Sequence, residues 1–291
     1  MITEAKKRGP RSWVVLDLES AVLDDTAHKR YQAMERWVPA EGKPSRRGYR
    51  RSEDPLSCPR WVFQTITTAS LMLLVEDAQG GVDVTRFVTL SAPDHDERDV
   101  IAGILRVLAD APDDAEIVTW MGLAHDLPIL INGCMRYGLN LPRGWGWLAH
   151  GGFHHTRHLD LARAYTAGMR MKPIHLAEVL AVLDIPGKIT CPPFAVTNLI
   201  YAGGWEEVQC ACEVDVISTA LLLARWRCLT DPRAEADSVE DRILRRVIEL
   251  RAGREYIAPL EVHRERRFAA KLEAVANDAH RLAPWLDRDA A

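Results

Sequence analysis

The feature of this sequence that most constrains its fold is the change of hydrophobic periodicity along the chain. Short β-branched and aromatic runs predict strands at 13–18, 61–75, 82–90 and 116–120. The turn signal DAQGG at 77–81 makes the second and third of these a hairpin. Apolar residues at helical spacing predict helices at 26–36, 97–110, 126–137, 159–167, 175–183, 193–202, 205–229, 238–251 and 259–281. This order predicts an α/β fold in which the strand at 116–120 runs parallel to the first strand.

The length of 291 residues suffices for one large domain with an appendage. Residues 12–230 are predicted to form the main domain, with an irregular, Arg- and Pro-rich excursion at 22–60. After Asp231-Pro232 the composition becomes charged and helical. Residues 231–291 are therefore predicted to be a helical C-terminal extension.

The charge of the chain does not suit a generally cationic nucleic-acid binder, because the net charge is −4. Basic residues nevertheless crowd between Lys43 and Arg51, where they either contact phosphates or form a solvated loop. No apolar run is long enough to span a membrane, and the run after the basic N-terminus is too short for a secretory signal. A cytoplasmic location with reduced cysteines is expected.

Two acidic residues end the first predicted strand. Asp17 and Glu19 are two positions apart, so their side chains point to the same face of a strand. Neighbouring carboxylates repel each other unless one is protonated or a cation lies between them. Mg²⁺ or Mn²⁺ would meet that need, but Asp-x-Glu is also common by chance.

Three more acids stand beside apolar segments. Asp126 follows a predicted strand and begins a helix, where it can be a metal ligand or an N-cap. Asp160 has the same two interpretations. Asp215 lies in a strongly apolar helix and needs either a cation or an arginine partner, whereas Glu213 can face solvent.

The segments VVLDLES, IVTWMGLAHDLPIL, HLDLAR, LDIPGK and CACEVDVISTALLLARW occur in this order between residues 12 and 230. As a set they resemble the DnaQ-like (DEDD) 3′–5′ exonuclease superfamily, and most of all predicted 3′–5′ exonucleases related to the proofreading domain of DNA polymerase B. The resemblance implies a ribonuclease H-like mixed sheet flanked by helices.

The resemblance also implies a function. It makes Asp17, Glu19, Asp126 and Asp215 the ligands of two Mg²⁺ or Mn²⁺ ions, with Asp17 bridging them. The implied reaction is hydrolysis of phosphodiester bonds at the 3′ end of single-stranded DNA or RNA.

The sequence departs from the family pattern at the third motif. A tyrosine four residues before the last aspartate, or a histidine five before it, orients water in the family, and here these positions are Ala211 and Cys210. In the second motif Met121 replaces an asparagine and His125 a phenylalanine. Two hypotheses follow. The first is a slower exonuclease in which the metals alone activate water, or in which His125 or another histidine substitutes for the missing group. The second is an inert module that binds nucleic acid. A partner-binding scaffold is a third.

Overall fold

A five-stranded mixed sheet forms the centre of the protein. The computed structural model describes residues 11–38, 54–150 and 157–282. The strands are β1 (Ser12–Ala21), β2 (Thr65–Glu76), β3 (Val82–Ser91), β4 (Glu116–Thr119) and β5 (His158–Asp160). Their order is β3-β2-β1-β4-β5, antiparallel from β3 to β1 and parallel from β1 to β5.

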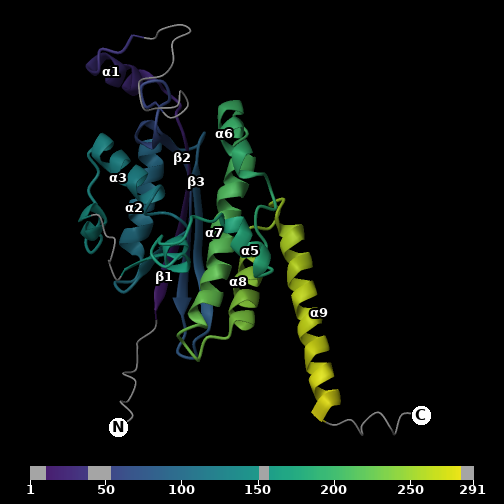
Figure 1. Ribbon diagram of the computed structural model, residues 1–291. Coiled ribbons are helices and arrows are strands. Elements are labelled where there is room, and N and C mark those ends of the chain that lie inside the picture. The colour runs from purple at the N-terminus through teal and green to yellow at the C-terminus, as the bar shows by residue number, and fades with distance from the viewer. Residues whose placement is uncertain (1–10, 39–53, 151–156, 283–291) are drawn as a thin grey trace.

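Helices cover both faces of this sheet (Figure 1). Alternate residues of β1 face opposite sides: Trp13 and Val15 belong to one apolar core, and Val14 and Leu16 to the other. The second core is closed by α2 (Glu97–Asp110) and α3 (Asp126–Tyr137). The first is closed by α5 (Leu176–Val182), α7 (Trp205–Arg227) and α8 (Ala236–Leu250). The predicted mixed sheet flanked by helices is confirmed.

Two predicted elements were wrong in detail. The helix expected at 159–167 is instead β5 followed by the short helix α4 (Leu161–Tyr165). His158, Leu159 and Asp160 pair with β4, and three residues are too few to show strand periodicity. The long strand expected at 61–75 begins with the 3-10 turn η1 (Trp61–Phe63) before β2.

Within the excursion between β1 and β2, a short helix packs against the segment that leads into β2. Its helix α1 (Thr26–Met34) places the buried His28 ring against Phe63, and the Nε2 atom of His28 lies 2.7 Å from the carbonyl oxygen of Pro55. Leu56 is also buried. The short helix expected at 26–36 is thus present as α1. The basic cluster from Lys43 to Arg51 lies outside the described residues.

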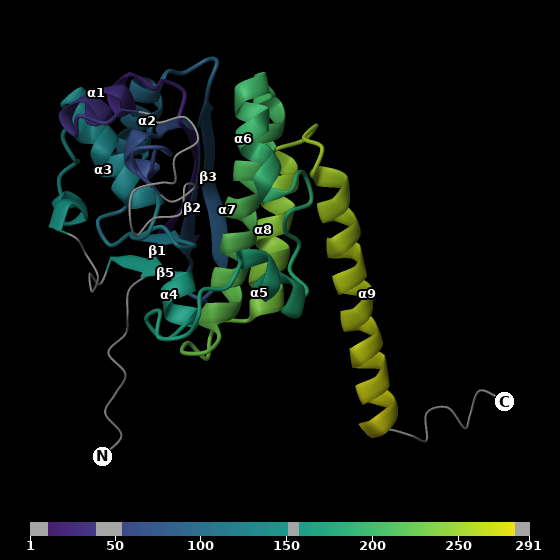
Figure 2. The ribbon, with the colours of Figure 1, turned by 45° about the horizontal axis from the view of Figure 1, so that its top comes forward.

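The C-terminal helices begin against the sheet. α8 packs on β3, and its residues Val239, Ile243 and Val247 belong to the same core as Trp13. α9 (Ile257–Leu282) starts at this core and then diverges from the body, as Figure 2 shows. A domain boundary near residue 230 stays a proposal. Among the described helices none is both long and apolar enough to cross a membrane.

Candidate metal centre

The Asp17 and Glu19 pair lies in the second half of β1, opposite Ser70 and Thr68 of β2. Residues 13, 15, 17 and 19 share one face of the strand, and Trp13 and Val15 show that this face points to α7. Directly after Glu19 the pairing with β2 shifts register. The two carboxylates thus lie just before an irregularity in the β1–β2 ladder.

Asp215 reaches this pair from α7. One turn before it, the Cys212 thiol donates to the backbone carbonyl oxygen of Asp17 at 3.4 Å, which fixes the helix over β1. One carboxylate oxygen from each of Asp17, Glu19 and Asp215 lies within 4.8 Å of the other two. Opposite ligands of a bound Mg²⁺ are about 4 Å apart, so the spacing is close to what a single ion requires.

Asp126 lies beside this group without belonging to it. β4 runs parallel to β1, and the chain leaving β4 brings Asp126 to the start of α3. It is the first residue of that helix and not its N-cap, which is His125. The negative charge of Asp126 raises the pKa of both Asp17 and Glu19. Three of the four expected ligands therefore meet closely, and the fourth is a near neighbour.

His125 adjoins Asp126 and is partly exposed. Its Nδ1 atom lies 3.2 Å from the Oδ1 atom of Asp126, and 45% of its side chain is exposed. The hydrogen bond to Asp126 raises the pKa of His125 above its ordinary 6.5. The imidazole thus lies at the edge of the centre with one ring nitrogen paired to a carboxylate, and histidine is a common general acid or base.

The carboxylates of this centre are all held in an unfavourable environment for negative charge. Burial, followed by the charges of neighbouring acids, raises the pKa of Asp17 well above its usual range and that of Glu19 to about 8. Burial also raises the pKa of Asp126 and Asp215. Only a cation lets such groups ionise together, because desolvation and mutual repulsion both favour the neutral acid.

The loop that carries His125 and Asp126 is held by Asp160. The two carboxylate oxygens of Asp160 accept from the backbone amides of Met121 and Leu123, each at 3.1 Å. One also accepts from the amide of Arg163 at 3.3 Å, so Asp160 is the N-cap of α4. The capping interpretation of Asp160 is confirmed, and its wider effect is to position the neighbouring loop.

Lys188 is a member of the centre to which the sequence assigned no role. Its Nζ atom forms a salt bridge with the Oδ2 atom of Asp215. Burial lowers the pKa of Lys188, but the charges of Asp215, Asp17 and Glu19 outweigh burial and raise it. Asp215 was expected to have either a metal cation or an arginine as its partner. The structure shows a salt bridge, and the partner is a lysine. Lys188 ends the LDIPGK segment, so the resemblance pointed to this stretch of the chain, but only the three-dimensional structure shows its pairing with Asp215.

Glu213, two residues before Asp215, points elsewhere. It was expected to face solvent, but it is completely buried and accepts hydrogen bonds from Thr89, Arg254 and Tyr256. These partners come from β3 and from the segment between α8 and α9. The prediction missed this because the partners lie far along the chain.

The positions of the absent tyrosine and histidine are buried in apolar surroundings. Ala211 packs with Ala21, Val196, Ile200 and Val208, and Cys210 belongs to the large core around α7. Burial raises the pKa of the Cys210 thiol to about 11, which keeps it protonated. Neither side chain offers a group that can orient water.

The donors of the centre fit a hard divalent cation. They are carboxylate oxygens, the ligands that Mg²⁺ and Mn²⁺ prefer. The Oδ1 atom of Asp215 is buried and has no hydrogen-bond partner among the described residues. A buried oxygen of this kind needs a partner, and a cation held with Asp17 and Glu19 would supply one.

Comparison with known proteins gives one sequence match. Residues 59–259 match the model of a family described as predicted 3′–5′ exonucleases related to the exonuclease domain of PolB. The matched segment contains Asp126, Lys188 and Asp215 but begins after β1, so Asp17 and Glu19 precede it. A search of curated proteins found no match.

Several solved structures are similar over most of this chain. The family B DNA polymerase from the hyperthermophilic archaeon Pyrobaculum calidifontis is 16% identical with a TM-score of 0.42, over 82% of this chain and 29% of the polymerase. E. coli exonuclease I in complex with a dT13 oligonucleotide is 13% identical with a TM-score of 0.36, over 77% and 42%. A product-bound exonuclease I is 13% identical with a TM-score of 0.37, over 77% and 45%. The chain spans less than half the length of each.

Proposed function

This chain belongs to the family of predicted 3′–5′ exonucleases related to the exonuclease domain of PolB, and on that premise we propose that it hydrolyses single-stranded DNA or RNA from the 3′ end with Mg²⁺ or Mn²⁺. The observation that carries the proposal is the convergence of Asp17, Glu19 and Asp215 within 4.8 Å. The sequence-based expectation was two ions. When bound, the metal would activate water and neutralise charge on the phosphodiester.

We propose a separate role for each residue of the centre. Asp17, Glu19 and Asp215 are proposed to hold the cation, and Asp126 to complete the ligand set. His125 is proposed to replace the missing phenol of the family, because it is partly exposed beside Asp126 and its ring can transfer a proton. Asp160 is a positioning residue, since it holds the loop behind His125 and Asp126.

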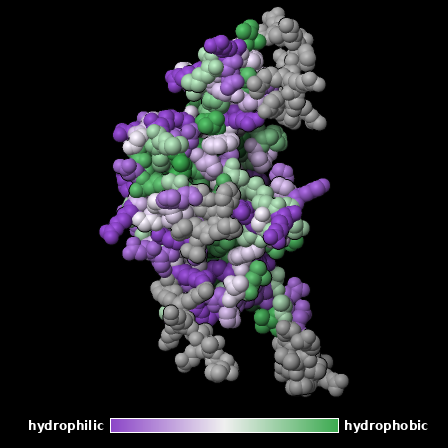
Figure 3. All heavy atoms as spheres, turned by 60° about the vertical axis from the view of Figure 1, so that its left-hand side comes forward, coloured by the Kyte–Doolittle hydropathy of each residue, from purple (hydrophilic) through white to green (hydrophobic). Residues whose placement is uncertain are grey.

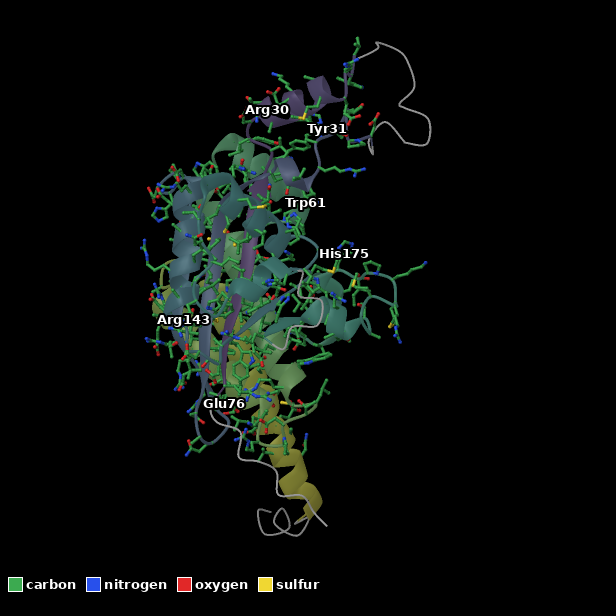
Figure 4. All side chains as sticks on the ribbon, turned by 90° about the vertical axis from the view of Figure 1, so that its left-hand side faces the viewer. Arg30, Tyr31, Trp61, Glu76, Arg143 and His175 are labelled. Carbon is green, nitrogen blue, oxygen red and sulfur yellow. The ribbon has the colours of Figure 1, made fainter. Side chains whose placement is uncertain are left out.

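Exposed aromatic side chains offer a place for bases to stack. Trp61 precedes β2 and is 42% exposed. In Figure 4 it lies on the same side of the molecule as Tyr31 and His175. Figure 3 shows apolar and polar side chains interspersed on the face seen there. Stacking on aromatic rings binds single strands without demanding a sequence, so this side is the proposed path of the substrate.

The test is release of mononucleotides from 5′- and 3′-labelled DNA and RNA oligonucleotides in Mn²⁺. Asp17→Asn and Asp215→Asn should each reduce the rate by at least about a hundredfold, because loss of an outer-shell partner alone costs about 10–100-fold in metal sites. Asp114→Asn, the same change at an exposed turn, is the control and should leave the rate unchanged. Cleavage that survives loss of Asp17 or Asp215 would contradict the proposed ligand set.

The second candidate is an inert module that binds nucleic acid, and Ala211 favours it. Ala211→Tyr should raise the cleavage rate if the site is a weakened exonuclease. Ala211 is 7% exposed inside an apolar cluster, so the added ring is also expected to destabilise the fold by about 1–3 kcal/mol. The rate must therefore be measured per folded molecule, with urea unfolding alongside. Metal-independent oligonucleotide binding with no cleavage by either protein would favour the inert module.

A further inference from the structure

Lys188 brings a positive charge into the carboxylate centre. Its ammonium pairs with the Oδ2 atom of Asp215, and 26% of its side chain is exposed. The negative charges of Asp17 and Glu19 also act on it. The ammonium thus contacts one of the three carboxylates that are proposed to hold metal.

The loop that carries Lys188 is fixed to the same helix as Asp215. The Ser218 hydroxyl, one turn after Asp215, donates to the carbonyl oxygen of Pro186 at 2.7 Å. A Cβ atom on Gly187 would lie 2.2 Å from Leu180, so the loop packs closely on α5. Lys188 itself has a φ of +53°, which L-residues seldom adopt. The backbone therefore holds this lysine at a defined place, even at a conformational cost.

The two oxygens of Asp215 have different surroundings. Oδ2 has the ammonium, whereas Oδ1 is buried and without a hydrogen-bond partner within the described parts of the chain. Two divalent ions in a shared carboxylate site lie about 3.5–4 Å apart. An ammonium in contact with Oδ2 takes up that oxygen as a ligand, and its positive charge repels a second ion near it.

We infer that the ammonium of Lys188 fills one of the two cation positions of the centre, so that the nucleotide-free protein takes up one divalent ion. This inference rests on the proposed function, because it assumes that Asp17, Glu19 and Asp215 bind metal. It goes beyond that function because it assigns the ammonium of Lys188 to a position that a metal ion would otherwise occupy.

The experiment counts bound Mn²⁺ in the nucleotide-free protein by isothermal titration and by the loss of the free-ion electron paramagnetic resonance signal. The parent should bind one ion per chain. Lys188→Met removes the charge and should bind two, the first at least about tenfold more tightly, because a like charge has left the site. Lys172→Met makes the same substitution at an exposed lysine and should bind one ion with the affinity of the parent.

The outcomes separate the inference from the proposed function. Two ions in the parent, or one ion in both the parent and Lys188→Met, would overturn the inference while leaving the metal site intact. No binding by the parent would overturn both. If Lys188→Met does not fold, Lys188→Gln keeps a hydrogen-bonding side chain without the charge, and it too should bind two ions. A count of one there would overturn the inference.

Discussion

Replacement of Glu213 by glutamine tests how firmly the C-terminal helices are joined to the sheet. The Glu213 carboxylate accepts from the Thr89 hydroxyl at 2.6 Å and the Tyr256 hydroxyl at 2.7 Å. The guanidinium of Arg254 lies 3.2 Å away. Burial and this carboxylate both raise the pKa of Tyr256, so the phenol stays a donor. One buried charge therefore ties β3 and the α8–α9 segment to α7.

The expected loss of stability on replacing Glu213 follows from the burial of its carboxylate. Removal of one partner from a buried ion pair destabilises a protein by about 3–5 kcal/mol. The Arg254 side chain is 22% exposed and can still reach water, which places the expected loss for Glu213→Gln near the lower end, about 3 kcal/mol. Arg254 also faces Glu206 at 3.9 Å, but 79% of the Glu206 side chain is exposed. Glu206→Gln should cost no more than about 1 kcal/mol.

The assay is urea unfolding of both variants and the parent, followed by tryptophan fluorescence and circular dichroism. The substitution, the helix and the arginine partner are the same in both variants, so the difference reports burial. Equal losses, within about 0.5 kcal/mol, would refute the argument that the buried network stabilises the fold.

Two further predictions concern the centre. Without metal, in EDTA, the pKa of Glu19 is about 8 in the folded protein and 4.5 ordinarily. Between these pH values the folded protein therefore keeps a proton that the unfolded chain releases. The stability that this proton contributes is fully present below pH 4.5 and should be lost as the pH rises through 8. Melting temperatures in EDTA should fall across that range and the fall should shrink in Mn²⁺, whereas a flat profile in EDTA would contradict the buried cluster. Asp160→Ala leaves the amides of Met121 and Leu123 without their acceptor and should cost about 1–3 kcal/mol in urea unfolding. The matched change Asp113→Ala, at an exposed turn, should cost less than about 0.5 kcal/mol.

The sequence predicted the elements with strong periodicity. The helices at 97–110 and 126–137 begin and end where they were expected, because each has a continuous apolar face. Asp17 and Glu19 share a strand face as alternation requires, and Asp215 reaches them. Each acid alone left a metal ligand and a structural role open, and it was the resemblance to the exonuclease family that grouped Asp17, Glu19 and Asp215 in one expected site.

The rest depended on contacts between distant segments. β5 is too short for periodicity, and its pairing with β4 alone defines it. Lys188 and Glu213 take their roles from partners 27 and 124 residues away. Local sequence indicates that a charge is present, but whether it meets solvent, another charge or a ligand is decided by the packing of helices on the sheet.

The packing of α8 on β3 has a practical consequence for anyone who dissects this protein. A fragment cut at residue 230 would lose Val239, Ile243 and Val247 from the core and would strip Glu213 of Arg254 and Tyr256. The uncovered apolar face of β3 and the unpaired carboxylate would together favour aggregation over folding. A shortened protein fit for expression should keep the chain at least through Leu260, the last residue of α9 in that core.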